Sequence, residues 1–112
     1  MRFDFRLPAF IPEMTDGKIY SILAEEGTQI RVGGALLEIA VDLSNVVAHD
    51  CPPIFLYRVF LREAAWLRKL LVKRDDLASV GAPLAVLTTT ANEPLEEHAK
   101  RPIRVSVAGV LW

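Results

Sequence analysis

The chain has only one cysteine, Cys51, and this scarcity argues against several classes of protein. A single thiol cannot build an internal disulfide framework, so we expect a reducing compartment, the cytoplasm. There is no CxxC or HxxxH spacing, and the histidines, His49 and His98, lie far apart, so no metal site is predicted. No glycine-rich phosphate loop follows a predicted strand, because Gly33-Gly34 is typical of a hairpin turn.

Excess charge and long apolar runs are also lacking. Among 112 residues there are 13 Lys+Arg and 14 Asp+Glu, and this near-balance offers no basic footprint for nucleic acid. No apolar run is long enough to cross a membrane, and charges interrupt the N-terminus too often for a signal peptide. The chain is 52% hydrophobic, which is enough for one globular core.

Two segments of the sequence resemble each other at an offset of 48 residues. The first covers residues 17–39 and the second covers residues 65–87. Similarity at a fixed offset is typical of a duplicated supersecondary unit, and two copies predict one core with two-fold pseudo-symmetry. The apolar positions that match are Ile19 with Leu67, Ile22 with Leu70, Leu23 with Leu71, Leu36 with Leu84 and Ile39 with Leu87.

Both copies are predicted to form short strands separated by turns. Residues 2–7 alternate polar and apolar side chains, as in a half-buried strand. Turns are expected at Asp16-Gly17, Glu26-Gly27 and Gly33-Gly34, because glycine tolerates positive φ, and Asp75 replaces Gly27 in the second copy. The regular spacing predicts an all-β fold, a flattened barrel or sandwich of two pseudo-symmetric repeats.

The middle of the chain carries conflicting signals. An apolar insert near residues 52–64 contains the stretch Ile54 to Leu61, which is interrupted only by Arg58. Residues 62–70 are rich in helix formers, yet the repeat register assigns residues 67–72 to a strand. We favour the strand and retain a short helix in the insert or in the tail as the alternative.

The last residues, 91–112, are predicted to form an extension beyond a first domain of residues 1–90. Asn92-Glu93-Pro94 resembles the N-cap and first turn of a short helix. A last strand is expected after Pro102, because apolar and polar side chains alternate there. Its apolar positions are Ile103, Val105 and Val107.

Short motifs along both copies match one known family. The first copy contains Glu25-Glu26-Gly27 and Leu36-Leu37-Glu38-Ile39, and the second contains Val80-Gly81-Ala82-Pro83. The first copy is preceded by the motif Leu7-Pro8-Ala9-Phe10-Ile11-Pro12-Glu13-Met14-Thr15-Asp16-Gly17. Together these motifs resemble the lipoyl carrier domains (biotinyl/lipoyl attachment superfamily) of 2-oxo-acid dehydrogenase acyltransferases. The resemblance covers residues 2–88 and implies a flattened barrel of two pseudo-symmetric halves.

The residue that carries the cofactor in this family is missing. In lipoyl domains a lysine between an aspartate and a small residue bears the group, and the equivalent residues here are Asp42, Leu43 and Ser44. Leucine has no amine for the amide bond, and no lysine occurs between Lys18 and Lys69. We therefore expect no lipoyl or biotinyl cofactor. The tip is interpreted as a β-turn left after loss of modification, and a remodelled recognition tip is the alternative.

The resemblance without its lysine implies an unmodified protein-binding or scaffold module with no catalytic residues. The alternative is an accessory or carrier component of a 2-oxo-acid dehydrogenase or acyltransferase complex, with Ser44 or Cys51 as the nucleophile. A third alternative is a homodimer formed through the apolar insert, since interface centres favour aromatic residues. The candidate interface residues are Phe55, Tyr57, Val59, Phe60 and Trp66.

Overall fold

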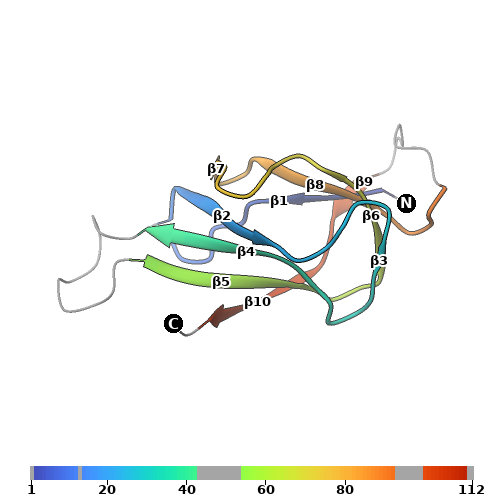
Figure 1. Ribbon diagram of the computed structural model, residues 1–112, viewed down its shortest axis with the longest axis horizontal. Coiled ribbons are helices and arrows are strands. Elements are labelled where there is room, and N and C mark those ends of the chain that lie inside the picture. Colours follow the sequence, from blue (N-terminus) through green and yellow to red (C-terminus); the bar gives the residue numbers. More distant parts are fainter. Residues whose placement is uncertain (1, 13, 43–53, 93–99, 111–112) are drawn as a thin grey trace.

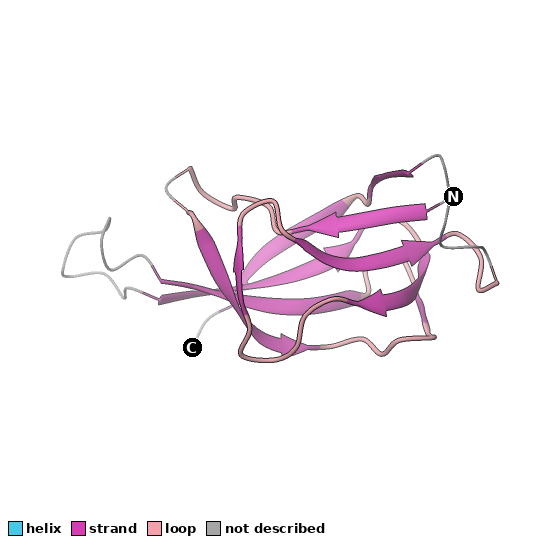
Figure 2. Ribbon diagram, turned by 90° about the horizontal axis from the view of Figure 1, so that it is seen from above, coloured by secondary structure: helices cyan, strands magenta, loops and turns pink. Residues whose placement is uncertain are grey.

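The protein is an all-β sandwich (Figures 1 and 2). The computed structural model describes residues 2–12, 14–42, 54–92 and 100–110, and within these ranges no helix occurs. The strands are β1 (Arg2–Arg6), β2 (Asp16–Ile22), β3 (Gln29–Ile30), β4 (Ala35–Asp42), β5 (Ile54–Leu61), β6 (Ala65–Leu70), β7 (Leu77–Ser79), β8 (Pro83–Thr88), β9 (Lys100–Pro102) and β10 (Val105–Val110).

The strands form two separate sheets. Sheet A has the order β3-β6-β8-β1-β9, and sheet B has the order β10-β5-β4-β2-β7. Neighbouring strands run antiparallel except β1 and β9, which are parallel. The all-β prediction is confirmed. The two sheets do not join into a closed barrel, so the sandwich form of the prediction describes the fold.

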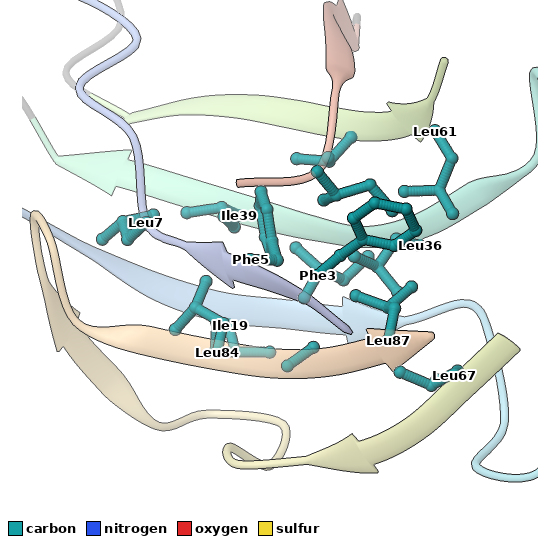
Figure 3. Packing of buried hydrophobic residues seen from close by; sticks show 14 of the residues in the cluster. Phe3, Phe5, Leu7, Ile19, Leu36, Ile39, Leu61, Leu67, Leu84 and Leu87 are labelled. Atoms are coloured by element: carbon teal, nitrogen blue, oxygen red, sulfur yellow. The ribbon is translucent and has the colours of Figure 1, made fainter. Parts of the chain in front are cut away.

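The core lies between the two sheets (Figure 3). Because successive side chains of a strand point to opposite faces, Phe3 and Phe5 of β1 are buried while Arg6 is exposed. Of the five apolar pairs that match at the 48-residue offset, three have both members completely buried. They are Ile19 with Leu67, Leu36 with Leu84 and Ile39 with Leu87. The largest fully buried side chains are Phe3, Leu7, Ile19, Leu36, Leu37, Ile39, Leu61, Leu67, Leu84, Leu87, Val41 and Val59.

The described part of the insert forms a strand, so the alternative prediction of a short helix there was wrong. β5 lies between β4 and β10 in sheet B and buries Val59 and Leu61 in the core. The helix formers at residues 62–70 are overridden, because Ala65 and Leu67 of β6 point into the core with the two-residue period of a strand. The short helix expected after Asn92 lies outside the described residues.

The C-terminal residues complete both sheets instead of standing apart from them. β9 pairs with β1 in sheet A, and β10 pairs with β5 in sheet B. Between them, Ile103 is 5% exposed and belongs to the core cluster. Its backbone N–H donates to the carbonyl oxygen of Asp4 at 3.3 Å. The last strand is therefore confirmed, and it belongs to the same folded unit as the rest of the described chain.

Gly17 corrects the turn predicted at Asp16-Gly17. It is buried inside β2, and a Cβ atom there would lie 2.6 Å from Cγ2 of Ile39. The glycine is thus required by the close approach of β2 and β4, not by a turn. The turns at Gly27 and Gly33 are confirmed, with φ of 85° and 84°.

Replacing Leu84 by alanine is expected to lower the free energy of unfolding by about 2–5 kcal/mol, because the side chain is fully buried. Leu77→Ala is the matched control. Leu77 is 71% exposed on β7, and its truncation should change the same quantity by about 0.5 kcal/mol or less. Urea denaturation followed by circular dichroism measures both variants. Equal losses in the two variants would contradict the placement of Leu84.

Candidate binding surfaces

The hairpin of β4 and β5 leads to the segment in which the sequence analysis expected a former attachment site. Asp42 at the end of β4 pairs with Ile54 at the start of β5, and both are exposed. This end of the hairpin lies at the opposite end of the long axis from β3 (Figure 1). Leu43, Ser44 and Cys51 lie outside the described residues.

One lysine lies closer to this hairpin than the sequence indicated. Lys18 of β2 pairs with Ala40 of β4. Ala40 lies two residues before Asp42, the last residue of that strand. Its ammonium nitrogen lies 3.8 Å from a carboxylate oxygen of Asp75, and both side chains are mostly exposed. Lys18 therefore has to be tested separately as an alternative attachment residue.

The five candidate interface residues do not form one surface. Val59 is completely buried, so it belongs to the core. Phe55 and Tyr57 are half-buried and pack against that core. Phe60 and Trp66 lie on the outer faces of sheets B and A, because their sequence neighbours point into the core. These outer faces point in opposite directions, so Phe60 and Trp66 cannot contribute to the same flat patch.

The loop after β1 covers part of the aromatic side of β5. The ring of Phe10 lies 4.9 Å from the ring of Tyr57, centroid to centroid, with a tilt of 35°. Such tilted pairs add favourable contact beyond the area that they bury. The loop therefore occupies surface that the insert would need for pairing with another molecule.

A buried carboxylate, which the sequence analysis missed, lies on the outer face of sheet B. The Glu38 side chain is 8% exposed, and its Oε2 lies 2.8 Å from Nη2 of Arg58 on the neighbouring strand. Nε of Arg58 donates to the same oxygen at 2.9 Å. The ion pair depends on the register of β4 with β5, and that register is not encoded in either strand alone. The ion pair connects β4 to β5, the strand that also pairs with β10.

A second carboxylate binds the C-terminal crossover, the segment that leads from β9 in sheet A to β10 in sheet B. Arg101 donates from Nη1 and Nη2 to the two oxygens of Glu63, at 2.8 and 2.5 Å. The backbone N–H of Arg104 donates to Oε2 of Glu63 at 2.9 Å. The bidentate contact with Arg101, helped by this backbone donor, lowers the pKa of Glu63 to about 2. The guanidinium also lies 4.4 Å from the ring centroid of Phe3.

An apolar groove of ≈ 480 Å³ opens beside this crossover. Its three charged residues are already engaged. Asp4 accepts a hydrogen bond from Nε of Arg2 at 3.0 Å. Nη1 of Arg6 donates to the carbonyl oxygen of Gly81 at 3.0 Å, and Arg101 binds Glu63. The remaining surface suits apolar side chains better than an ionic ligand. The groove is lined by Asp4, Phe5, Arg6, Leu7, Pro8, Arg101, Pro102, Ile103 and Val105.

The other classes of site can be checked only where the structure describes the chain. Over those ranges no group of three or more His, Cys, Asp or Glu side chains could hold a metal ion. The same ranges include no helix that is long and apolar enough to cross a membrane. Comparisons of the whole chain with family models, curated proteins and solved structures found no match.

Glu63→Gln is expected to lower the free energy of unfolding at neutral pH by about 1 kcal/mol. The effect is smaller than for a buried ion pair, because solvent screens this partly exposed one. The pKa of Glu63 is lowered from 4.5 to about 2 on folding, so its contribution is complete above pH 4.5 and disappears as the pH falls toward 2. Urea titrations across this window measure it.

The control for this experiment is Glu26→Gln, since Glu26 is exposed in the turn before Gly27. Between pH 4.5 and 2 the free energy of unfolding of Glu26→Gln should fall as much as that of the wild type. That of Glu63→Gln should fall less, because the variant has no carboxylate to protonate at this position. Parallel curves for the wild type and Glu63→Gln would show that the carboxylate does not stabilise the crossover.

Proposed function

We propose that the protein is a lipoyl-like β domain that carries no lipoyl or biotinyl group and acts as a protein-binding or scaffold module. The proposal is carried by the correspondence between the two halves of the backbone. It is completed by the leucine that follows Asp42, where the family has its lysine.

The order of the strands supports a duplicated frame. Each of β1 to β4 corresponds to the strand four numbers later, β5 to β8. When corresponding strands are exchanged, the order β3-β6-β8-β1 of sheet A becomes β7-β2-β4-β5. This is the order found in sheet B when it is read from β7. The register irregularities correspond too. One lies between Ile19 and Ser21 where β2 meets β4, and another lies between Leu67 and Lys69 where β6 meets β8.

The strained backbone positions support the same frame. The described residues with positive φ are Gly27, Gly33, Asp75 and Gly81, at 85°, 84°, 75° and 91°. They form two pairs separated by 48 residues. Aspartate adopts positive φ at some cost relative to glycine, so Asp75 is most simply explained as the relic of a turn that glycine makes in the first half.

Backbone hydrogen bonds between the halves are reciprocal. The N–H of Gly27 donates to the carbonyl oxygen of Leu67 at 2.7 Å, and the N–H of Asp75 donates to that of Ile19 at 2.7 Å. Each half therefore supplies a turn that binds a strand of the other half. Reciprocity of this kind is what a two-fold pseudo-symmetric lipoyl-like frame requires, although the side chains have diverged.

The function follows from what such a frame can do without its amine. A carrier needs a residue at the hairpin to which the acyl arm is joined, and Leu43 offers none. What remains is a rigid sandwich with an exposed apolar residue, Ile54, at the hairpin and an apolar groove at the crossover. Of these two features, the groove is the one that could accept apolar side chains of a protein partner.

Co-expression with an active lipoate ligase tests whether the chain is unmodified and whether its hairpin is lipoyl-like. The wild type should keep the mass of the bare chain, and Leu43→Lys should gain one lipoyl group, because Asp42 still precedes the new lysine. Leu43→Lys combined with Lys18→Arg should be modified equally well. The control Val80→Lys places a lysine on the turn after β7 and should stay bare. Intact mass spectrometry reads all four proteins.

Three results would contradict the proposal. A lipoylated wild type would show that Lys18 or another lysine replaces the family residue. An unmodified Leu43→Lys variant that folds would show that the hairpin lacks lipoyl-like geometry. An acyl adduct on Ser44 or Cys51 after incubation with acyl-coenzyme A would favour the accessory or carrier role over the scaffold.

A further inference from the structure

Among the described strands, four form the edges of the two sheets, and three of them are protected from further pairing. β3 and β7 have only two and three residues, and β9 has three residues that include Pro102. β10 has six residues without proline or charge, and its register with β5 is unbroken. Natural edge strands are usually kept short, charged or bulged, because free N–H and C=O groups recruit other strands. β10 has none of these protections.

The outer side of β10 is open. In the described part of the chain only β5 pairs with β10, and residues 106–109 are exposed. Val107 keeps 38% of its surface in solvent. A Cβ atom added to Gly109 would meet no other atom within 4 Å. Another strand therefore has room to lie along this edge.

The backbone groups that face outward can be assigned. The N–H of Arg62 donates to the carbonyl oxygen of Arg104 at 2.9 Å, which directs the polar groups of Arg104 toward β5. Because these groups alternate sides along an antiparallel strand, Ser106 and Ala108 also bond to β5. The residues whose N–H and C=O point away from the sheet are therefore Val105, Val107 and Gly109.

We propose that β10 pairs antiparallel with β10 of a second copy of this chain, across a two-fold axis at Val107. The two copies of sheet B then form one continuous sheet. In this register Val107 pairs with itself and Val105 pairs with Gly109 of the other copy. About six backbone hydrogen bonds form, two for each pair of outward-facing residues. The inference does not rest on the proposed function, since a lipoylated domain could pair in the same way.

Charge identifies a second copy as the occupant. A two-fold axis places each residue opposite its own neighbours, so a charged strand would repel itself. Residues 105–112 include no charged side chain. The cation beside the strand, Arg58, faces Ala108 and is neutralised by Glu38 at 2.8 Å. β9, by contrast, contains Lys100 and Arg101 and would meet its own charges. Strand pairing alone buries a small area, so the dimer depends on concentration.

Sedimentation equilibrium over a wide range of concentrations tests the proposal. The mean mass of the wild type should rise from that of a monomer toward twice that value. Val107→Lys places like charges opposite each other on the axis and should remain monomeric. Val80→Lys is the matched control, because Val80 is also 38% exposed but lies outside β10, and it should dimerise as the wild type does. A wild type that is monomeric throughout, or a folded Val107→Lys that dimerises equally, overturns the proposal.

Amide hydrogen exchange of the wild type gives an independent reading if Val107→Lys fails to fold. The amides of Val107 and Gly109 should exchange more slowly as the protein concentration rises, whereas that of Ala78 on β7 should not change. Exchange rates that are independent of concentration would refute the pairing.

Discussion

The structure depends on one constraint: the apolar faces of the two sheets must be removed from water against each other. The sequence has one cysteine, so no internal disulfide assists this packing. Ile19, Leu36 and Ile39 from sheet B meet Leu67 and Leu84 from sheet A, and all five are completely buried (Figure 3). Each such side chain contributes about 1.5–3 kcal/mol. The positions of the hairpin, the groove and the edge strands all follow from how these faces are aligned.

The same constraint explains the C-terminal crossover. A sandwich leaves an open side where its sheets diverge, and Ile103 fills that side between β9 and β10. The crossover brings Arg101, whose side chain is 37% exposed, to Glu63, which accepts hydrogen bonds from it with both oxygens. Closing the sandwich in this way also sends the last strand along β5, and no other described strand covers its outer edge. The feature that completes the core is therefore the one that exposes a pairing surface.

Local patterns in the sequence predicted what is local in the structure. The alternation in β1, the buried residues of the 48-residue offset and the turns at Gly27 and Gly33 were all readable in this way. Contacts between distant segments were not. Nothing near Glu38 identifies Arg58 as its partner, because that contact follows from the register of two strands. Residues 62–70 looked helical because composition ignores the neighbouring strands that make β6 stable. The attachment position at Leu43 lies outside the described residues and stays a prediction.

The central proposal is that this chain is a lipoyl-like domain that carries no cofactor. The most direct test is the intact mass of the protein purified from its own cells, with no added ligase. The account predicts a mass equal to that of the bare polypeptide, with no covalent adduct on residues 1–112. A stoichiometric increase by a lipoyl, biotinyl or acyl group on any residue would contradict it and would identify the protein as a carrier.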